Sequence, residues 1–120
     1  MFLPQSSEVA IDAAMAALNR HGLHVVRSFD LKQALGSRED PCGKPVNGSV
    51  VCDCQYVVLL AYRGGEGPVV VTAHSDLEAT YLRVLPGTEG HAGPRLRARV
   101  ETALRLLEWR IANPVQGGGR

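Results

Sequence analysis

The stretch CDCQYVVLLAYRGGEGPVVVTAHSD, residues 52–76, decides the fold of this chain. Two runs rich in branched apolar residues flank the glycine-rich GGEG, which predicts an antiparallel β-hairpin. We expect the first strand to begin at Val51 and to occupy a central place in its sheet. Its second half is continuously apolar, which predicts burial on both faces.

Two long amphipathic helices are predicted outside the hairpin. Apolar residues recur at helical spacing over residues 7–21, where Ser6 or Ser7 can cap the start. A second such pattern opens after Pro94 and continues to Ile111. Each helix has one apolar face, so we expect both to pack on the sheet.

Shorter elements complete the predicted fold. Residues 23–29 and 79–85 are rich in branched and aromatic residues and predict two further strands. The segment DLKQALG, residues 30–36, predicts a short helix with Asp30 as its cap. We therefore predict an α/β fold of the α+β type, with a three- to four-stranded antiparallel sheet, two long helices on one face and one short helix.

Length and composition narrow the class of protein. The 120 residues (12.9 kDa) fit one domain, which we assign to residues 1–112, followed by a disordered tail over 113–120. The 13 basic and 12 acidic side chains give a net charge of +1, too little to predict nucleic acid as a partner. No apolar run approaches the ~20 residues that cross a bilayer, and no signal peptide is visible, so we expect a cytoplasmic protein without membrane contact.

The order of these elements resembles the family catalogued as domain of unknown function 302. Residues 22–26, 30–36 and 54–76 stand where that family has its first strand, its short Leu-Lys helix and its hairpin. The chain departs from the family in a shorter connection before the hairpin, in Asp53 where the family has proline, and in the added thiol of Cys52. The resemblance implies a compact, cysteine-enriched relative that forms a homodimer and has no established reaction.

The three cysteines of the chain, Cys42, Cys52 and Cys54, are its most specific chemical feature. Side chains alternate along a strand, so Cys52 and Cys54 point to the same side with Cα atoms ~6.6 Å apart. That spacing disfavours a disulfide between them. Because cytoplasmic thiols are normally reduced and three cysteines cannot all pair within one chain, we expect free thiols.

A soft metal ion, zinc or copper, is the ligand that this cluster predicts. Cys42 lies on a loop and can fold back as a third ligand, and His74 is the candidate fourth ligand. The hairpin register decides its role: His74 shares the cysteine face if it pairs with Tyr56, and faces away if it pairs with Val57. No organic cofactor is predicted, and the expected role is non-enzymatic sensing, buffering or structural support.

Two alternatives stay open. Cys42 can form a disulfide with either strand cysteine, which would make this a thiol redox or persulfide-carrying protein. The thiols can also be incidental to a dimeric partner-binding module. Hydrolysis is not expected from the AHSD segment, residues 73–76, because neighbouring strand residues point apart and no nucleophile elbow precedes them. No catalytic residue is therefore assigned.

Overall fold

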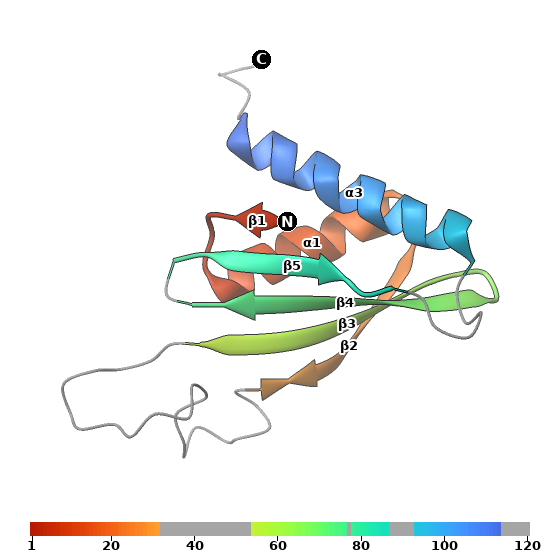
Figure 1. The fold of residues 1–120 in the computed structure, drawn as a ribbon, viewed down its shortest axis with the longest axis horizontal. Helices are drawn as coiled ribbons and strands as arrows, with labels where there is room; N and C mark the ends of the chain where they lie inside the picture. Colours follow the sequence, from red (N-terminus) through yellow and green to blue (C-terminus); the bar gives the residue numbers. More distant parts are fainter. Residues whose placement is uncertain (32–53, 77, 87–92, 114–120) are drawn as a thin grey trace.

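The computed structural model describes residues 1–31, 54–76, 78–86 and 93–113. Within them the chain forms one antiparallel sheet and two helices, so the predicted α+β class is confirmed (Figure 1). The elements in chain order are β1 (Phe2–Leu3), α1 (Ser7–Arg20), β2 (His24–Asp30), β3 (Gln55–Arg63), β4 (Glu66–Ser75), β5 (Thr80–Val84) and α3 (Pro94–Ala112).

The sheet has five strands in the order β1-β5-β4-β3-β2, one more than the three or four predicted. The extra strand, β1, has only two residues, which is too short for an alternating pattern to reveal it. Tertiary contacts hold it: Phe2 pairs with Tyr81, and the backbone N–H of Phe2 donates to a carboxylate oxygen of Glu108 on α3 at 2.8 Å.

The predicted hairpin is present, and the glycines make its turn. Arg63 pairs with Glu66, and Gly64 between them has φ of +60°, a conformation that glycine adopts without strain. β2, β5 and both helices also match their predicted positions within a few residues. Ser6 occupies the N-cap position of α1, although its side chain makes no capping hydrogen bond.

Two predicted features fall at the boundary of the described residues. Asp30 is the last residue of β2, and most of the short helix expected over residues 30–36 lies outside the described residues, as does the start of the first hairpin strand before Cys54.

Both helices lie on the same face of the sheet, and between them and the strands lies an entirely aliphatic core (Figure 1). β3 illustrates the pattern, since Val57, Leu59 and Ala61 are fully buried against the helices. The buried apolar side chains are Leu3, Ala10, Ile11, Ala14, Ala17, Leu18, Leu23, Val57, Leu59, Ala61, Val69, Val71, Ala73, Leu82, Leu96, Val100, Ala103, Leu104 and Leu107.

The opposite side of the sheet, here called the open face, is covered by no described helix or strand. Residues of β3 that alternate with the buried ones, such as Leu60 and Tyr62, are only half-buried. The prediction that the second half of this strand is buried on both faces is therefore wrong for the described structure. From the strand pairings, the open face consists of Phe2, His24, Val26, Phe29, Tyr56, Val58, Leu60, Tyr62, Val70, Thr72, His74, Tyr81 and Arg83.

Two leucines of α3 provide a matched test of this core. Leu104 is fully buried, whereas Leu106, two residues along the same helix, is 43% exposed. We expect Leu104→Ala to lower the free energy of unfolding by about 2 to 5 kcal/mol, because it leaves a cavity, and Leu106→Ala by less than about 1 kcal/mol. Urea denaturation followed by circular dichroism measures both, and equal losses would contradict the described packing of α3.

Candidate functional site

The register of the β3–β4 hairpin decides which side chains meet where β3 begins. Tyr56 pairs with His74, and Val57 pairs with Ala73. Directly paired residues point to the same face, so His74 lies on the open face beside Tyr56, with ring centroids 6.4 Å apart. Of the two registers that the sequence leaves open, the chain has the one that brings His74 to the face of Tyr56.

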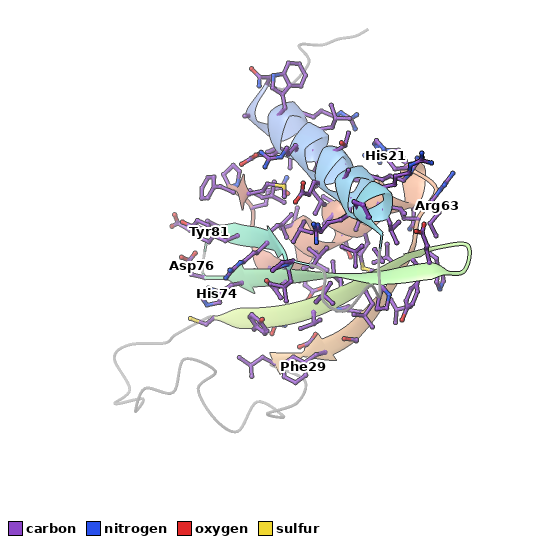
Figure 2. All side chains as sticks on the ribbon, turned by 45° about the vertical axis from the view of Figure 1, so that its right-hand side comes forward. His21, Phe29, Arg63, His74, Asp76 and Tyr81 are labelled. Atoms are coloured by element: carbon purple, nitrogen blue, oxygen red, sulfur yellow. The ribbon has the colours of Figure 1, made fainter. Side chains whose placement is uncertain are left out.

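Aromatic rings continue from this pair across the sheet. Tyr81 of β5 pairs with His74, and its ring contacts that of Phe2 in a tilted arrangement at a centroid distance of 5.2 Å. The ring of Phe29 of β2 lies 6.4 Å from that of Tyr56. These five residues, one from each strand, are called the aromatic row. Figure 2 shows Phe29, His74 and Tyr81 at the same end of the sheet.

Cys54 lies at this end, one residue before β3, and its sulfur is disulfide-bonded. The expectation of a free thiol is therefore wrong for Cys54. The odd number of cysteines showed only that not all three can pair within one chain, which leaves room for one disulfide. A disulfide sulfur carries no thiolate, so Cys54 can bind a metal ion only after reduction.

Two of the four predicted metal ligands, Cys54 and His74, belong to the described residues, and both lie at this end of the sheet. Cys42 and Cys52 lie outside them. In the described part of the chain no group of three or more His, Cys, Asp or Glu side chains is placed to hold a metal ion.

The other histidines lie elsewhere. His21 caps the C-terminus of α1 at the opposite end of the molecule (Figure 2). His24 shares the open face but pairs with Tyr62, six residues beyond Tyr56 along β3 and so ~20 Å away. His91 lies outside the described residues. His74 is thus the histidine that the described structure brings to the start of β3.

The two polar residues after His74 have structural roles. Ser75 is buried on the helix side of the sheet, and its Oγ lies 2.8 Å from Oγ1 of Thr80. Because Thr80 Oγ1 donates its own proton to the carbonyl oxygen of Gln5 at 3.0 Å, the Ser75 hydroxyl is the donor to Thr80. Ser75 and His74 therefore point to opposite faces and cannot act together as nucleophile and base.

Asp76 organises the turn between β4 and β5. Its Oδ1 accepts hydrogen bonds from the backbone N–H groups of Glu78 and Ala79, each at 3.0 Å. These two bonds stabilise the ionised carboxylate and lower the pKa of Asp76 below its ordinary value, with a smaller contribution from nearby His74. The carboxylate is thereby committed to the turn that follows His74.

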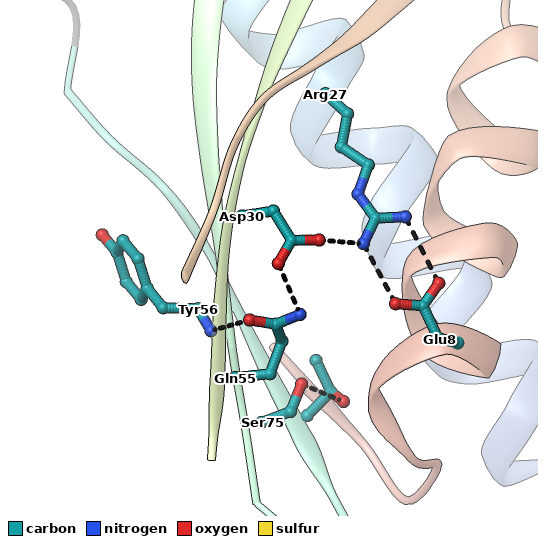
Figure 3. Close-up of polar contacts among 7 residues, drawn as sticks. Glu8, Arg27, Asp30, Gln55, Tyr56 and Ser75 are labelled. Atoms are coloured by element: carbon teal, nitrogen blue, oxygen red, sulfur yellow. Dashed lines mark hydrogen bonds and ion pairs between the residues drawn. The ribbon is translucent and has the colours of Figure 1, made fainter. Parts of the chain in front are cut away.

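A polar network closes the helix side of the same end of the sheet (Figure 3). The guanidinium of Arg27 donates to both carboxylate oxygens of Glu8, at 3.0 and 3.3 Å, and to Asp30 at 2.7 Å. Asp30 in turn accepts from the amide of buried Gln55 at 2.9 Å, and the Gln55 amide oxygen accepts from the backbone N–H of Tyr56 at 3.0 Å. The network ties α1 and β2 to the first residues of β3.

The network also changes the basicity of its arginine. The hydrogen bond to Glu8, followed by the contacts with Asp30, raises the pKa of Arg27 above its ordinary value although partial burial opposes the shift. Arg27 is therefore a permanent cation between two carboxylates. Sequence reasoning missed this network, and the only signal was a polar Gln55 at the start of an apolar strand.

Comparisons with protein-family models, curated proteins and solved structures found no match to this chain. The resemblance to the family catalogued as domain of unknown function 302 therefore stays a prediction. Among the described residues, neither helix is long and apolar enough to cross a membrane.

The Asp76 turn predicts a pH dependence of stability. Folding lowers the pKa of this carboxylate, so its ionised form stabilises the folded state at pH values above 3.8, the pKa of the unfolded chain. This contribution disappears as the pH falls through the lower pKa of the folded state. We expect Asp76→Ala to be less stable than the wild type at neutral pH, with the difference shrinking in acid. Denaturation at several pH values measures it, and a difference that is constant with pH would contradict the ionised capping role.

Proposed function

We propose that the protein binds a soft metal ion, zinc or copper(I), through Cys42, Cys52, Cys54 and His74. The observation that carries the proposal is the pairing of His74 with Tyr56, which puts this histidine on the open face at the strand end that Cys54 precedes. The role is non-enzymatic, as a sensor, a buffer or a structural support, in the reducing cytoplasm. Cys42 and Cys52 enter as predictions from the sequence.

The chemistry of Cys54 and His74, the two proposed ligands within the described residues, supports a zinc or copper(I) site. Diagonal neighbours on paired strands lie ~7 Å apart at Cα, close enough for a cysteine and a histidine side chain to converge on one ion. Zinc binds thiolate sulfur at ~2.3 Å and imidazole nitrogen at ~2.0 Å, and sites with three cysteines and one histidine are common structural zinc sites. Copper(I) is equally suited to a set dominated by thiolates.

The disulfide at Cys54 adds a condition to the proposal. Metal ions bind the thiolate, so a Cys54 that is oxidised is removed from the ligand set. The metal-binding form is therefore the reduced protein, and oxidation releases the ion. Metal affinity should depend on the redox state of the thiols and on pH, because each ligand must lose its proton before it binds.

The same disulfide favours thiol redox chemistry as a second candidate. Two thiols of the chain would give up two electrons and two protons to an external disulfide, which is reduced to its two thiols as the internal disulfide forms. A histidine near a cysteine favours the thiolate that attacks in such an exchange. In this case His74 would act on the reactivity of Cys54 without being a ligand.

The metal proposal is tested by titrating reduced, untagged full-length protein with zinc in competition with a chromophoric chelator. We expect one ion per chain and a reduction in affinity of about tenfold or more in His74→Ala, because a ligand is lost. The matched control is His24→Ala, which removes a histidine from the far end of the same face and should leave the affinity unchanged.

Thiol titration separates the two candidates. In the metal-binding protein zinc protects the cysteines from a thiol reagent, and a chelator restores their reactivity. Three thiols that react equally with and without zinc would contradict the metal proposal. A disulfide that reforms readily with an external disulfide, at a rate that drops in His74→Ala, would favour the redox function instead.

A further inference from the structure

The open face gathers nearly all aromatic side chains of the chain. The protein has three tyrosines, two phenylalanines and one tryptophan, and only Trp109, on α3, lies elsewhere. On the open face Tyr81 is 51% exposed, Phe2 43% and Phe29 40%. Aromatic residues clustered on one surface are typical of the centre of protein interfaces. Metal binding at His74 uses one end of this surface and leaves the rest without a role.

Part of the open face beyond the aromatic row is aliphatic. Val26 pairs with Leu60, and Leu60 pairs with Val70, so three apolar side chains cross the neighbouring strands β2, β3 and β4 side by side. The central strands are thus apolar on both sides, although the two helices cover only one. A strand with this composition is typical of a sheet that is covered on both faces.

The face has the size that a dimer needs. Strands lie ~4.8 Å apart and rise ~3.3 Å per residue, so four strands of about eight residues present on the order of 500 Å². The strand β1 and the uneven surface formed by the side chains increase this area. Two such faces in contact bury on the order of 1,000 Å² or more in total, which reaches the range of specific protein interfaces.

The charges on the face favour a protein partner over nucleic acid. Among its described residues Arg83 is the one arginine or lysine, there is no carboxylate, and the whole chain has a net charge of +1. Nucleic-acid surfaces need several cations to neutralise phosphates. A face that is apolar at its centre and nearly uncharged is suited to contact with a surface of the same kind.

We propose that the open face binds a second copy of this chain, so that two sheets stack face to face about a two-fold axis. In such an interface the same patch of each copy meets the other. If the two-fold axis runs parallel to the strands, midway between β3 and β4, then β2 of each copy lies opposite β5 of its partner. Direct pairings link Arg83 to Thr72, Thr72 to Val58 and Val58 to Phe29, so Arg83 lies level with Phe29 and then faces an aromatic ring of the partner and not another arginine.

Two valines offer a matched test by analytical ultracentrifugation of the full chain under reducing conditions. Val26 lies on the open face and is 39% exposed, whereas Val9 lies on α1 and is 53% exposed. We expect the wild type and Val9→Glu to be dimers, and Val26→Glu to weaken the dimer at least tenfold, because it puts two uncompensated charges into the interface. Tyr81→Glu, at a more exposed position of the same face, should have the same effect, and circular dichroism verifies that each variant is folded.

Several results would overturn the proposal. These are a wild type that is monomeric at every concentration, or a dimer weakened by Val9→Glu and not by Val26→Glu. A monomer whose β3 amides and open-face side chains are protected would show that the chain itself covers the face, and binding of single-stranded RNA in place of dimerisation would assign it to nucleic acid. The variant Val26→Glu retains Cys54 and His74, so zinc titration of its reduced form tests the metal site independently of dimerisation.

Discussion

The pairing of Tyr56 with His74 is the constraint on which the rest of the structure depends. Because side chains alternate along a strand, this register sends Val57, Leu59, Val71 and Ala73 to the helix side, where all four are fully buried. A shift of β4 by one residue would turn its buried valines toward the open face and bring His74 into the core. The burial of aliphatic side chains therefore selects the register, and the register places His74.

The two sides of the sheet are stabilised by different chemistry. On the helix side, aliphatic side chains fill the space beneath α1 and α3, and the polar network of Arg27, Asp30 and Gln55 satisfies hydrogen-bonding groups where this layer ends. On the open face the larger rings lie at the surface. The helix side accounts for the fold of the single chain, and the open face is the side that no described helix or strand covers.

Much of the fold follows from local patterns in the sequence. The hairpin, both long helices and the strand of Thr80–Val84 have periodicities and turn residues that identify them. β1 could not be found in this way, because two residues carry no period and its pairing with Tyr81 depends on contacts distant in the sequence. The salt bridges of Arg27 could not be predicted either, because no spacing in the sequence indicates that Glu8 and Asp30 are its partners.

The candidate site was predictable only up to a choice between alternatives. The sequence named His74 as a ligand and named the two possible registers, but the packing of the complete sheet was needed to choose between them. The apolar run in β3 was correctly assigned to a strand, yet it could not reveal that the described helices cover one side only. Whether a second face is covered by the same chain or by another molecule is not encoded in the period of a strand.

The separation of aliphatic and aromatic side chains also determines what optical methods can observe. All three tyrosines, Tyr56, Tyr62 and Tyr81, lie on the open face, and Trp109 is exposed near the end of α3. The core contains no chromophore apart from the peptide bonds themselves. Tyrosine absorbance and fluorescence therefore report on what covers the sheet, whereas the packing of the interior is followed through the far-ultraviolet signal of the backbone.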